Sequence, residues 1–162
     1  MLTHEYLKSV LHYDPESGVF TRLISNNGFI KINSIAGTIH PKGYVIIGIN
    51  KKYYKAHRLA WFYMHGVWPE NQIDHINHNK SDNSIINLRL ATNAENTQNK
   101  IKPRSDNKCG LLGVSYYKNY GNYVAQIQVN NKKRLLGYFT TPEEAHEAYL
   151  KAKRELHPFC TI

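Results

Sequence analysis

The spacing of apolar and polar residues predicts short helices and strands in the first hundred positions. Apolar residues at helical spacing predict helices over 3–12 and 56–65, and Gly66 suits the end of the second helix. Short β-rich runs predict strands over 19–21, 44–49 and 53–55, and polar residues predict a loop over 25–34. The next segment predicts, in order, a strand over 72–74, a long polar loop over 75–87, a strand over 88–91 and a short helix over 93–99.

The last third of the chain has a different pattern. It predicts three strands over 114–117, 122–129 and 133–139, with strict alternation in the middle strand. A helix is predicted next, because Thr141 is a suitable N-cap and Pro142 suits the first turn. Glu144 would complete a capping box by accepting a bond from the backbone N–H of Thr141. One helix on a three-stranded antiparallel sheet covers one face of the sheet and leaves the other face free to bind a partner.

Composition adds a charge argument. Lysine and arginine number 21 against 12 aspartates and glutamates, which gives a formal charge of +9. Such a balance favours a polyanionic partner, first of all nucleic acid, although charge for solubility alone stays open. Cys109 and Cys160 lack zinc-site or disulfide spacing. We expect neither a signal peptide nor a membrane span, and therefore a cytoplasmic protein, in the host cell if a phage encodes it.

The chemistry-bearing residues gather between the strands of residues 72–91. Hydrolysis of a phosphodiester needs a base for water, which a histidine of near-neutral pKa supplies. It also needs a hard divalent cation on oxygen ligands. Asp74 and His75 place a carboxylate and an imidazole side by side, and adjacent side chains of a strand point in opposite directions.

This segment resembles the HNH endonucleases, the ββα-metal fold of phage and intron homing nucleases. The matching residues are Asp74-His75, Asn87-Leu88-Arg89 and Asn96, with His57-Arg58-Leu59-Ala60-Trp61 upstream. The resemblance implies that His75 is the general base, that Asp74 and Asn96 are the metal ligands, and that Asn87 closes the loop and fixes the histidine. It implies Mg²⁺, or Mn²⁺, as one divalent ion.

Several neighbouring residues keep two interpretations. Asn87 is architectural rather than chemical on general grounds, and Asp82 and Asn83 most simply shape the loop. His57 packs against the active site in one interpretation and has no role there in the other. Arg58 and Arg89 are candidate phosphate contacts, although Arg89 equally suits bracing of the second strand.

Residues 113–157 resemble the AP2 domain, a three-stranded sheet plus helix that binds DNA. The match rests on Gly113-Val114, Tyr123–Ile127, Leu136–Phe139 and Glu143–Tyr149, but Ser115 and Tyr117 stand where plant-type members carry arginines. Core packing is expected for at least half of Tyr116, Tyr117, Tyr120 and Tyr123. Besides Arg58 and Arg89, the expected DNA contacts are Lys100, Lys102, Arg104, Tyr116, Lys118, Gln126, Gln128, Lys132, Lys133 and Arg134.

The expected fold class is therefore α+β. An HNH (ββα-metal) nuclease domain occupies residues 1–100, a basic linker residues 101–112, and an AP2-like sheet and helix residues 113–162. The expected function is a metal-dependent, homing-type DNA endonuclease that acts as a monomer on double-stranded DNA, without a protein partner or a membrane. The alternatives are a non-catalytic DNA-binding regulator with a degenerate nuclease fold, and an RNA-binding protein.

Overall fold

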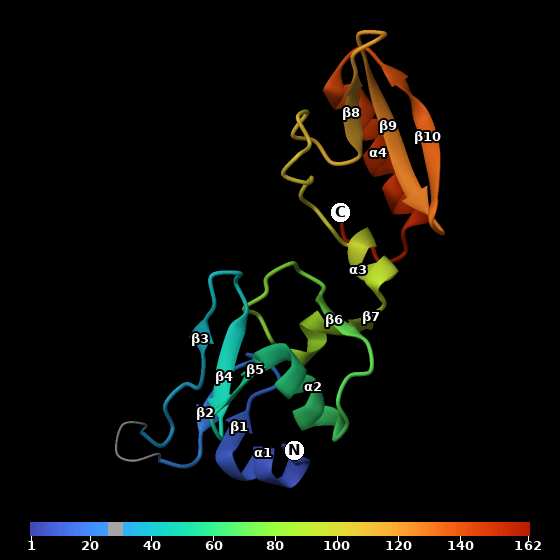
Figure 1. Cartoon of the computed structure of the whole chain (residues 1–162). Coiled ribbons are helices and arrows are strands. Elements are labelled where there is room, and N and C mark those ends of the chain that lie inside the picture. The colour runs from blue at the N-terminus through green and yellow to red at the C-terminus, as the bar shows by residue number, and fades with distance from the viewer. Residues whose placement is uncertain (26–30) are drawn as a thin grey trace. The chain divides into compact units, whose positions relative to one another are not determined.

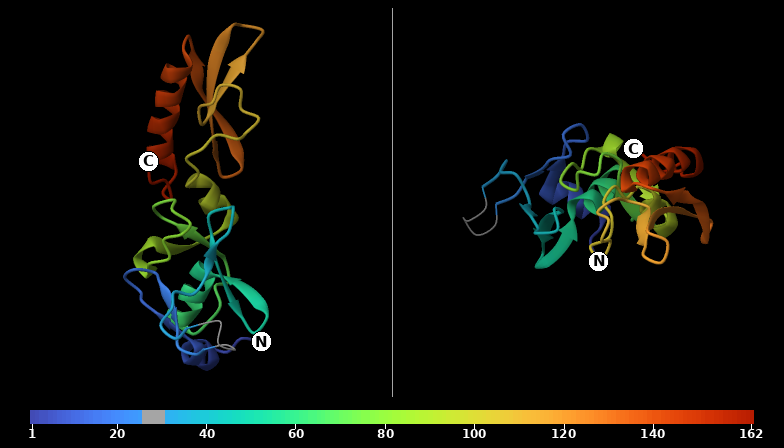
Figure 2. Two further views of the ribbon diagram at one scale, coloured as in Figure 1. Left: turned by 90° about the vertical axis from the view of Figure 1, so that its left-hand side faces the viewer. Right: turned by 90° about the horizontal axis from the view of Figure 1, so that it is seen from above.

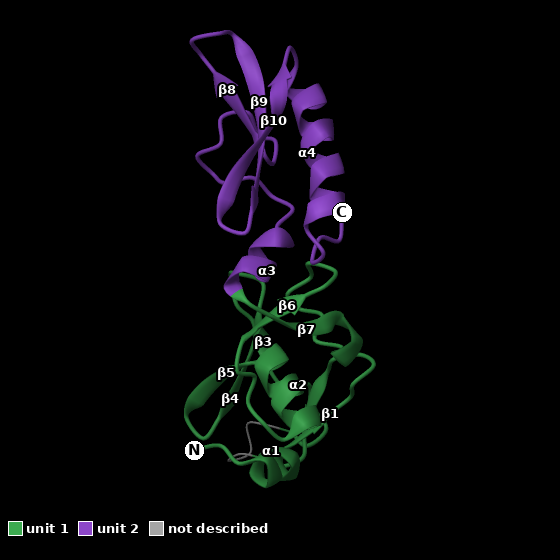
Figure 3. Cartoon of the chain, turned by 90° about the vertical axis from the view of Figure 1, so that its right-hand side faces the viewer, with its two compact units in different colours: residues 1–92 green, residues 93–162 purple. Residues whose placement is uncertain are grey.

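The computed structural model describes residues 1–25 and 31–162, so part of the loop predicted over 25–34 lies outside the described residues. The chain forms two compact units, residues 1–92 and 93–162 (Figure 3). This division places the short helix after residue 92 and the basic segment 101–112 with the second unit. The functional domain boundaries at 100 and 112 stay a prediction.

The first unit begins with helix α1 (His4–Val10), which is shorter than the helix predicted over 3–12. Thr3 caps it by accepting a bond from the backbone N–H of Tyr6 at 3.2 Å. The chain then turns extended as β1 (Leu11–Tyr13), which pairs antiparallel with β2 (Phe20–Arg22). Leu11 and Tyr13 are buried in this strand, so Leu11, which was assigned to the end of the helix, instead begins a strand.

A three-stranded antiparallel sheet follows, in the order β3 (Thr38–Ile39), β4 (Val45–Ile49), β5 (Lys52–Lys55) (Figure 1). Helix α2 (Ala56–His65) has the bounds that the sequence predicts. Gly66 ends it with a φ of 72°, in the left-handed region that glycine adopts without strain. The two-residue strand β3 was not predicted, and both of its residues are exposed.

The core of the first unit supports the segment that carries the candidate chemistry. Leu7, Leu11, Ile47 and Leu59 are fully buried, and Ile73 and Leu88 belong to the same cluster. The last two residues lie on β6 (Gln72–His75) and β7 (Leu88–Ala91), which form an antiparallel hairpin. A one-turn 3₁₀ helix, η1 (Ile85–Asn87), leads into β7.

The second unit begins with the short helix α3 (Asn93–Gln98) and continues into an antiparallel sheet. The sheet contains β8 (Val114–Tyr117), β9 (Asn122–Val129) and β10 (Lys132–Phe139), with β9 in the centre. Helix α4 (Pro142–Leu156) lies along one face of the sheet, as the red helix beside the orange strands shows in Figure 2. Ala145, Tyr149 and Ala152 form the buried side of α4, and the capping box predicted at Thr141 and Glu144 is present.

The tyrosines of the β8–β9 hairpin correct one expectation. Tyr116, Tyr117 and Tyr120 expose 51%, 43% and 71% of their surface, and only Tyr123 packs against the core of this unit. The prediction that at least half of the four are core residues is therefore wrong. Among the described residues, no helix combines the length and apolarity needed to cross a bilayer.

Candidate active site

Asp74 and His75 end the first strand of the β6–β7 hairpin. The register pairs Asp74 with Arg89 and His75 with Leu88, so the strand continues through both candidate residues. Asp74 is 7% and His75 5% exposed. Neighbouring residues on a strand face opposite sides, and the carboxylate and the imidazole therefore have different surroundings.

The carboxylate of Asp74 is held by its cross-strand partner. Nε and Nη2 of Arg89 donate to the same oxygen, Oδ2 of Asp74, at 3.0 and 2.9 Å. A buried carboxylate needs such a partner, because desolvation without compensation is costly. Arg89 thus does what the bracing interpretation expects, and its contact with DNA stays a prediction.

The imidazole of His75 faces the side-chain amide of Asn83. The distance from Nε2 of His75 to Oδ1 of Asn83 is 3.5 Å. An amide oxygen only accepts, so this contact favours the tautomer that carries its proton on Nε2 and keeps a lone pair on Nδ1. Burial lowers the pKa of His75, and the Asn83 contact and the charges of Asp74 and Asp82 oppose this shift. A histidine of this kind is neutral at neutral pH and able to accept a proton.

Two further rings enclose His75. The ring of His57 meets it edge-on, with centroids 5.0 Å apart and an interplanar angle of 88°. The ring centroid of Tyr44 lies 5.3 Å from that of His57 and 6.2 Å from that of His75. Burial lowers the pKa of His57 to about 3, so this ring is neutral. Among the described residues, Nδ1 of His57 is buried without a hydrogen-bond partner.

The loop between β6 and β7 is held by its own amides and carboxylate. Asn87 accepts from the backbone N–H of Asn77 and donates to the backbone oxygen of Asp82, both at 2.9 Å. Asp82 accepts from the Ser84 hydroxyl at 2.7 Å, which lowers the pKa of this carboxyl, and from the Asn77 amide at 2.6 Å. These bonds are architectural. The catalytic assignment of Asn87 stays a prediction, and Asn83 is the amide that reaches His75.

The N-terminal segment braces the same loop. The Tyr13 hydroxyl donates to the backbone oxygen of Asn83 at 2.7 Å, and the N–H of Ile85 donates to the backbone oxygen of Pro15 at 2.9 Å. Gly18 lies so close that a Cβ would stand 2.2 Å from the backbone nitrogen of Ser84. Residues 13–18 therefore support the loop that carries Asn83, a role that no sequence pattern indicated.

The predicted metal ligands are an incomplete set by themselves. Across residues 1–25 and 31–162, no group of three or more histidine, cysteine, aspartate or glutamate side chains gathers where an ion would bind. Asp74 is buried in the first unit, and Asn96 lies on α3 of the second unit, where it has partners of its own. One carboxylate ligand and one amide ligand suit a cation that retains several water ligands, as Mg²⁺ usually does.

The predicted DNA contacts fall into two groups. In the first unit, Arg58 donates to the backbone oxygen of Pro69 at 3.3 Å and is half-buried. In the second unit the predicted cations are exposed, and Arg104 pairs with Asp106 at 3.0 Å. The strand register places Gln126, Gln128 and Lys133 on one face, because cross-strand partners share a face. By the same argument, Tyr116, Lys132 and Arg134 lie on the opposite face, which α4 covers.

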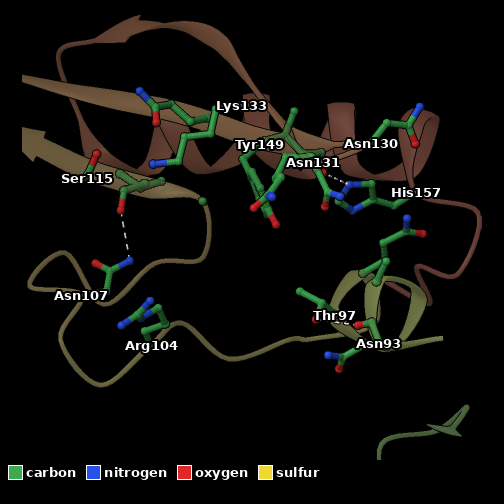
Figure 4. A pocket seen from close by; sticks show the side chains of 17 residues that line it. Asn93, Thr97, Arg104, Asn107, Ser115, Asn130, Asn131, Lys133, Tyr149 and His157 are labelled. Carbon is green, nitrogen blue, oxygen red and sulfur yellow. Dashed lines mark hydrogen bonds between the residues drawn. The ribbon is translucent and has the colours of Figure 1, made fainter. Parts of the chain in front are cut away.

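A pocket in the second unit brings four of the predicted contacts together. Its volume is about 930 Å³, and Arg104, Gln126, Gln128 and Lys133 line it (Figure 4). Further amides come from α3, from the segment before β8 and from the β9–β10 turn; they belong to Asn93, Gln98, Asn107, Asn130 and Asn131. The lining therefore combines amides with two cations, which are the groups that contact bases and phosphates.

Comparisons with known proteins match the segment that contains Asp74 and His75. Residues 54–98 match the family model described as HNH endonuclease. An HNH endonuclease of Acanthamoeba polyphaga mimivirus is 37% identical over 84 residues, which are 52% of this chain and 42% of that protein. Protein 3.8 of Escherichia phage T7 is 32% identical over 111 residues, which are 66% of this chain and 90% of that protein.

Residues 54–98 are therefore an HNH endonuclease domain. The chain belongs to the same family as protein 3.8 of phage T7, most of whose length it matches. It spans less than half of the mimivirus protein. A solved structure of the HNH homing endonuclease I-HmuI, described as binding and cleaving DNA, has a TM-score of 0.45 at 21% identity. The likeness covers 78% of this chain and 71% of that chain.

Proposed function

We propose that the protein is a metal-dependent endonuclease that hydrolyses phosphodiester bonds of double-stranded DNA with His75 as its general base. The observation that carries this proposal is a buried, neutral imidazole beside the buried carboxylate of Asp74, inside the segment that matches the HNH model. A neutral imidazole accepts a proton at physiological pH, which the attack of water on a phosphate requires.

In this mechanism Nδ1 of His75 takes the proton of the attacking water. Asn83 holds the opposite ring nitrogen, and His57 and Tyr44 fix the plane of the ring by packing. Arg89 orients the carboxylate of Asp74. Asp74 and Asn96 would hold one Mg²⁺ or Mn²⁺, and a bound divalent cation supplies positive charge for the phosphate and the leaving oxygen.

The second unit would bind DNA as an AP2-like module. Support comes from its exposed cations, from the sheet face opposite α4 and from the pocket lined by Arg104, Gln126, Gln128 and Lys133. These side chains would give phosphate and base contacts, and residues 101–112 would act as the basic linker. We propose that the protein acts on DNA as a monomer.

A supercoiled-plasmid assay tests the proposal. Purified protein with Mg²⁺ or Mn²⁺ should convert supercoiled plasmid to nicked or linear forms, and EDTA should abolish the conversion. Gel shifts should retain duplex DNA more strongly than structured RNA. Binding of duplex without any metal-dependent cutting would favour a non-catalytic DNA-binding regulator, and equal retention of structured RNA would favour an RNA-binding protein.

A further inference from the structure

Two lysines that the proposed mechanism does not use flank the tyrosine beside the active site. Nζ of Lys55 lies 4.6 Å and Nζ of Lys80 4.9 Å from the centroid of the Tyr44 ring. The three residues come from different segments: Tyr44 precedes β4, Lys55 ends β5, and Lys80 lies in the loop after β6. Folding of the first unit is therefore what brings the two ammonium groups together.

Tyr44 links this pair to the candidate base. Its ring packs against both His57 and His75, so each ammonium lies one aromatic ring away from the imidazole. The charges act at this range, because Lys80 helps to lower the pKa of His75 and Lys55 that of His57. Two positive charges therefore lie close to the candidate base, both at the Tyr44 ring.

Both ammonium groups keep capacity for an anion. Lys55 and Lys80 are exposed, and within the described residues neither has a carboxylate in ion-pair range. Lys80 uses one of its three donors on the backbone oxygen of Lys42, at 3.3 Å, which fixes its position. Since cation–π contacts at exposed sites are weak, the Tyr44 ring orients the two charges without neutralising them.

The start of α2 adds to the same potential. Lys55 is the N-cap of this ten-residue helix and makes no side-chain bond to it, and the first turn holds no acidic residue. No acidic residue of the first turn therefore compensates the positive end of the helix dipole, which begins at Lys55. The start of α2 thus adds to the charge of Lys55, while Lys80 comes from a separate loop.

We propose that Tyr44, Lys55 and Lys80 form a binding subsite for backbone phosphates of the DNA strand next to the scissile phosphate. This inference rests on the proposed function, because it takes DNA as the substrate of the His75 site. The subsite reads no sequence, since lysines at phosphates bind charge alone. It would fix the strand with the scissile bond at the base.

The salt dependence of duplex binding tests this subsite. Fluorescence anisotropy of a labelled duplex of arbitrary sequence, in EDTA so that no cutting occurs, gives the slope of log affinity against log salt for the full-length protein. Lys55→Gln and Lys80→Gln should each reduce that slope by about 0.9, and the double variant by about twice as much. Lys55→Arg and Lys80→Arg should keep the wild-type slope.

Lys8→Gln is the matched control. Lys8 is exposed and lies 5.1 Å from the ring centroid of Tyr63, a like contact whose ring packs on Tyr13 and Phe20 instead of His75. Its slope should equal that of wild type. Three results would each overturn the subsite. They are unchanged slopes in Lys55→Gln and Lys80→Gln, an equally reduced slope in Lys8→Gln, and a reduced slope in the two arginine variants. The readout needs no cutting, so an inactive protein that showed the expected slopes would refute the enzyme and leave Lys55 and Lys80 as phosphate contacts of a DNA-binding surface without a scissile bond.

Discussion

Arg89 places two nitrogens on one oxygen of Asp74, at 3.0 and 2.9 Å, across the β6–β7 hairpin. The ion pair fixes the direction of the carboxylate that is proposed to hold the cation. It also links the two strands through their side chains, in addition to the backbone pairing of Asp74 with Arg89. An arginine in this position would act on the proposed cation through Asp74.

We predict that Arg89→Gln raises the Mg²⁺ concentration needed for half-maximal cutting. Partners that orient a metal ligand typically contribute about 10–100-fold in metal affinity or activity. Titration of cutting rate against Mg²⁺ measures the shift, with Arg154→Gln on the exposed side of α4 as a control. A normal Mg²⁺ requirement in Arg89→Gln would show that Asp74 needs no such partner.

The pH dependence of stability should report on His57. Its pKa is about 3 in the folded protein, below the unfolded value, so the unfolded chain takes up the proton first as pH falls. The contribution of neutral His57 to the free energy of unfolding is complete above about pH 6.5 and is lost as pH falls toward 3. At pH 5 about 2 kcal/mol of this contribution is lost. Urea unfolding at pH 7 and pH 5 should show a smaller difference for His57→Phe than for wild type. Because the pKa of His75 is also lowered, the pH dependence of the unfolding free energy should be smaller in His57→Phe than in wild type but should not vanish.

The close approach of Gly18 to the active-site loop predicts a clash. Gly18→Ala puts a methyl group against the backbone of Asn83 and Ser84, where overpacking typically costs about 1–3 kcal/mol. Gly66→Ala is the matched control, because both glycines have a φ of +72° but a Cβ at Gly66 would meet only His4, at an ordinary contact distance of 3.8 Å. Gly18→Ala should lose more unfolding free energy and more cutting activity than Gly66→Ala. Equal losses would mean that backbone strain alone matters at both positions.

The lowered pKa of His75 predicts the shape of the rate profile. A base must be neutral to act, so cutting should rise with pH through a value below the ordinary histidine pKa of about 6.5 and be level near neutrality. Cutting rates at limiting DNA between pH 5 and pH 8 give this profile. An acidic limb centred above pH 7 would contradict the buried, neutral imidazole.

Local signals account for what the sequence predicted well. Helix α2 ends at Gly66 and α4 begins at a capping box because these residues fix chain ends by local hydrogen bonds. The strands of the β8–β10 sheet follow their alternation. The HNH domain was identifiable because its pattern extends along one continuous segment, which includes Asp74 and His75.

Long-range packing explains what the sequence could not show. β1 has only three residues after a helix, so its alternation is too short to separate from a helical pattern. The contacts of Asn83 with His75 and of Gly18 with the loop depend on how distant segments fold together. Tyr44, Lys55 and Lys80 likewise meet only in the folded unit. Periodicity carries no information about such contacts.

The single-turnover cutting rate of His75→Ala tests the role of this histidine as general base most directly. Saturating protein on a labelled duplex with Mg²⁺ measures the chemical step, and anisotropy in EDTA measures affinity for the same duplex. We predict a rate lower by about a hundredfold or more with unchanged affinity, as loss of a general base requires. A His75→Ala variant that cuts at the wild-type rate would contradict this role.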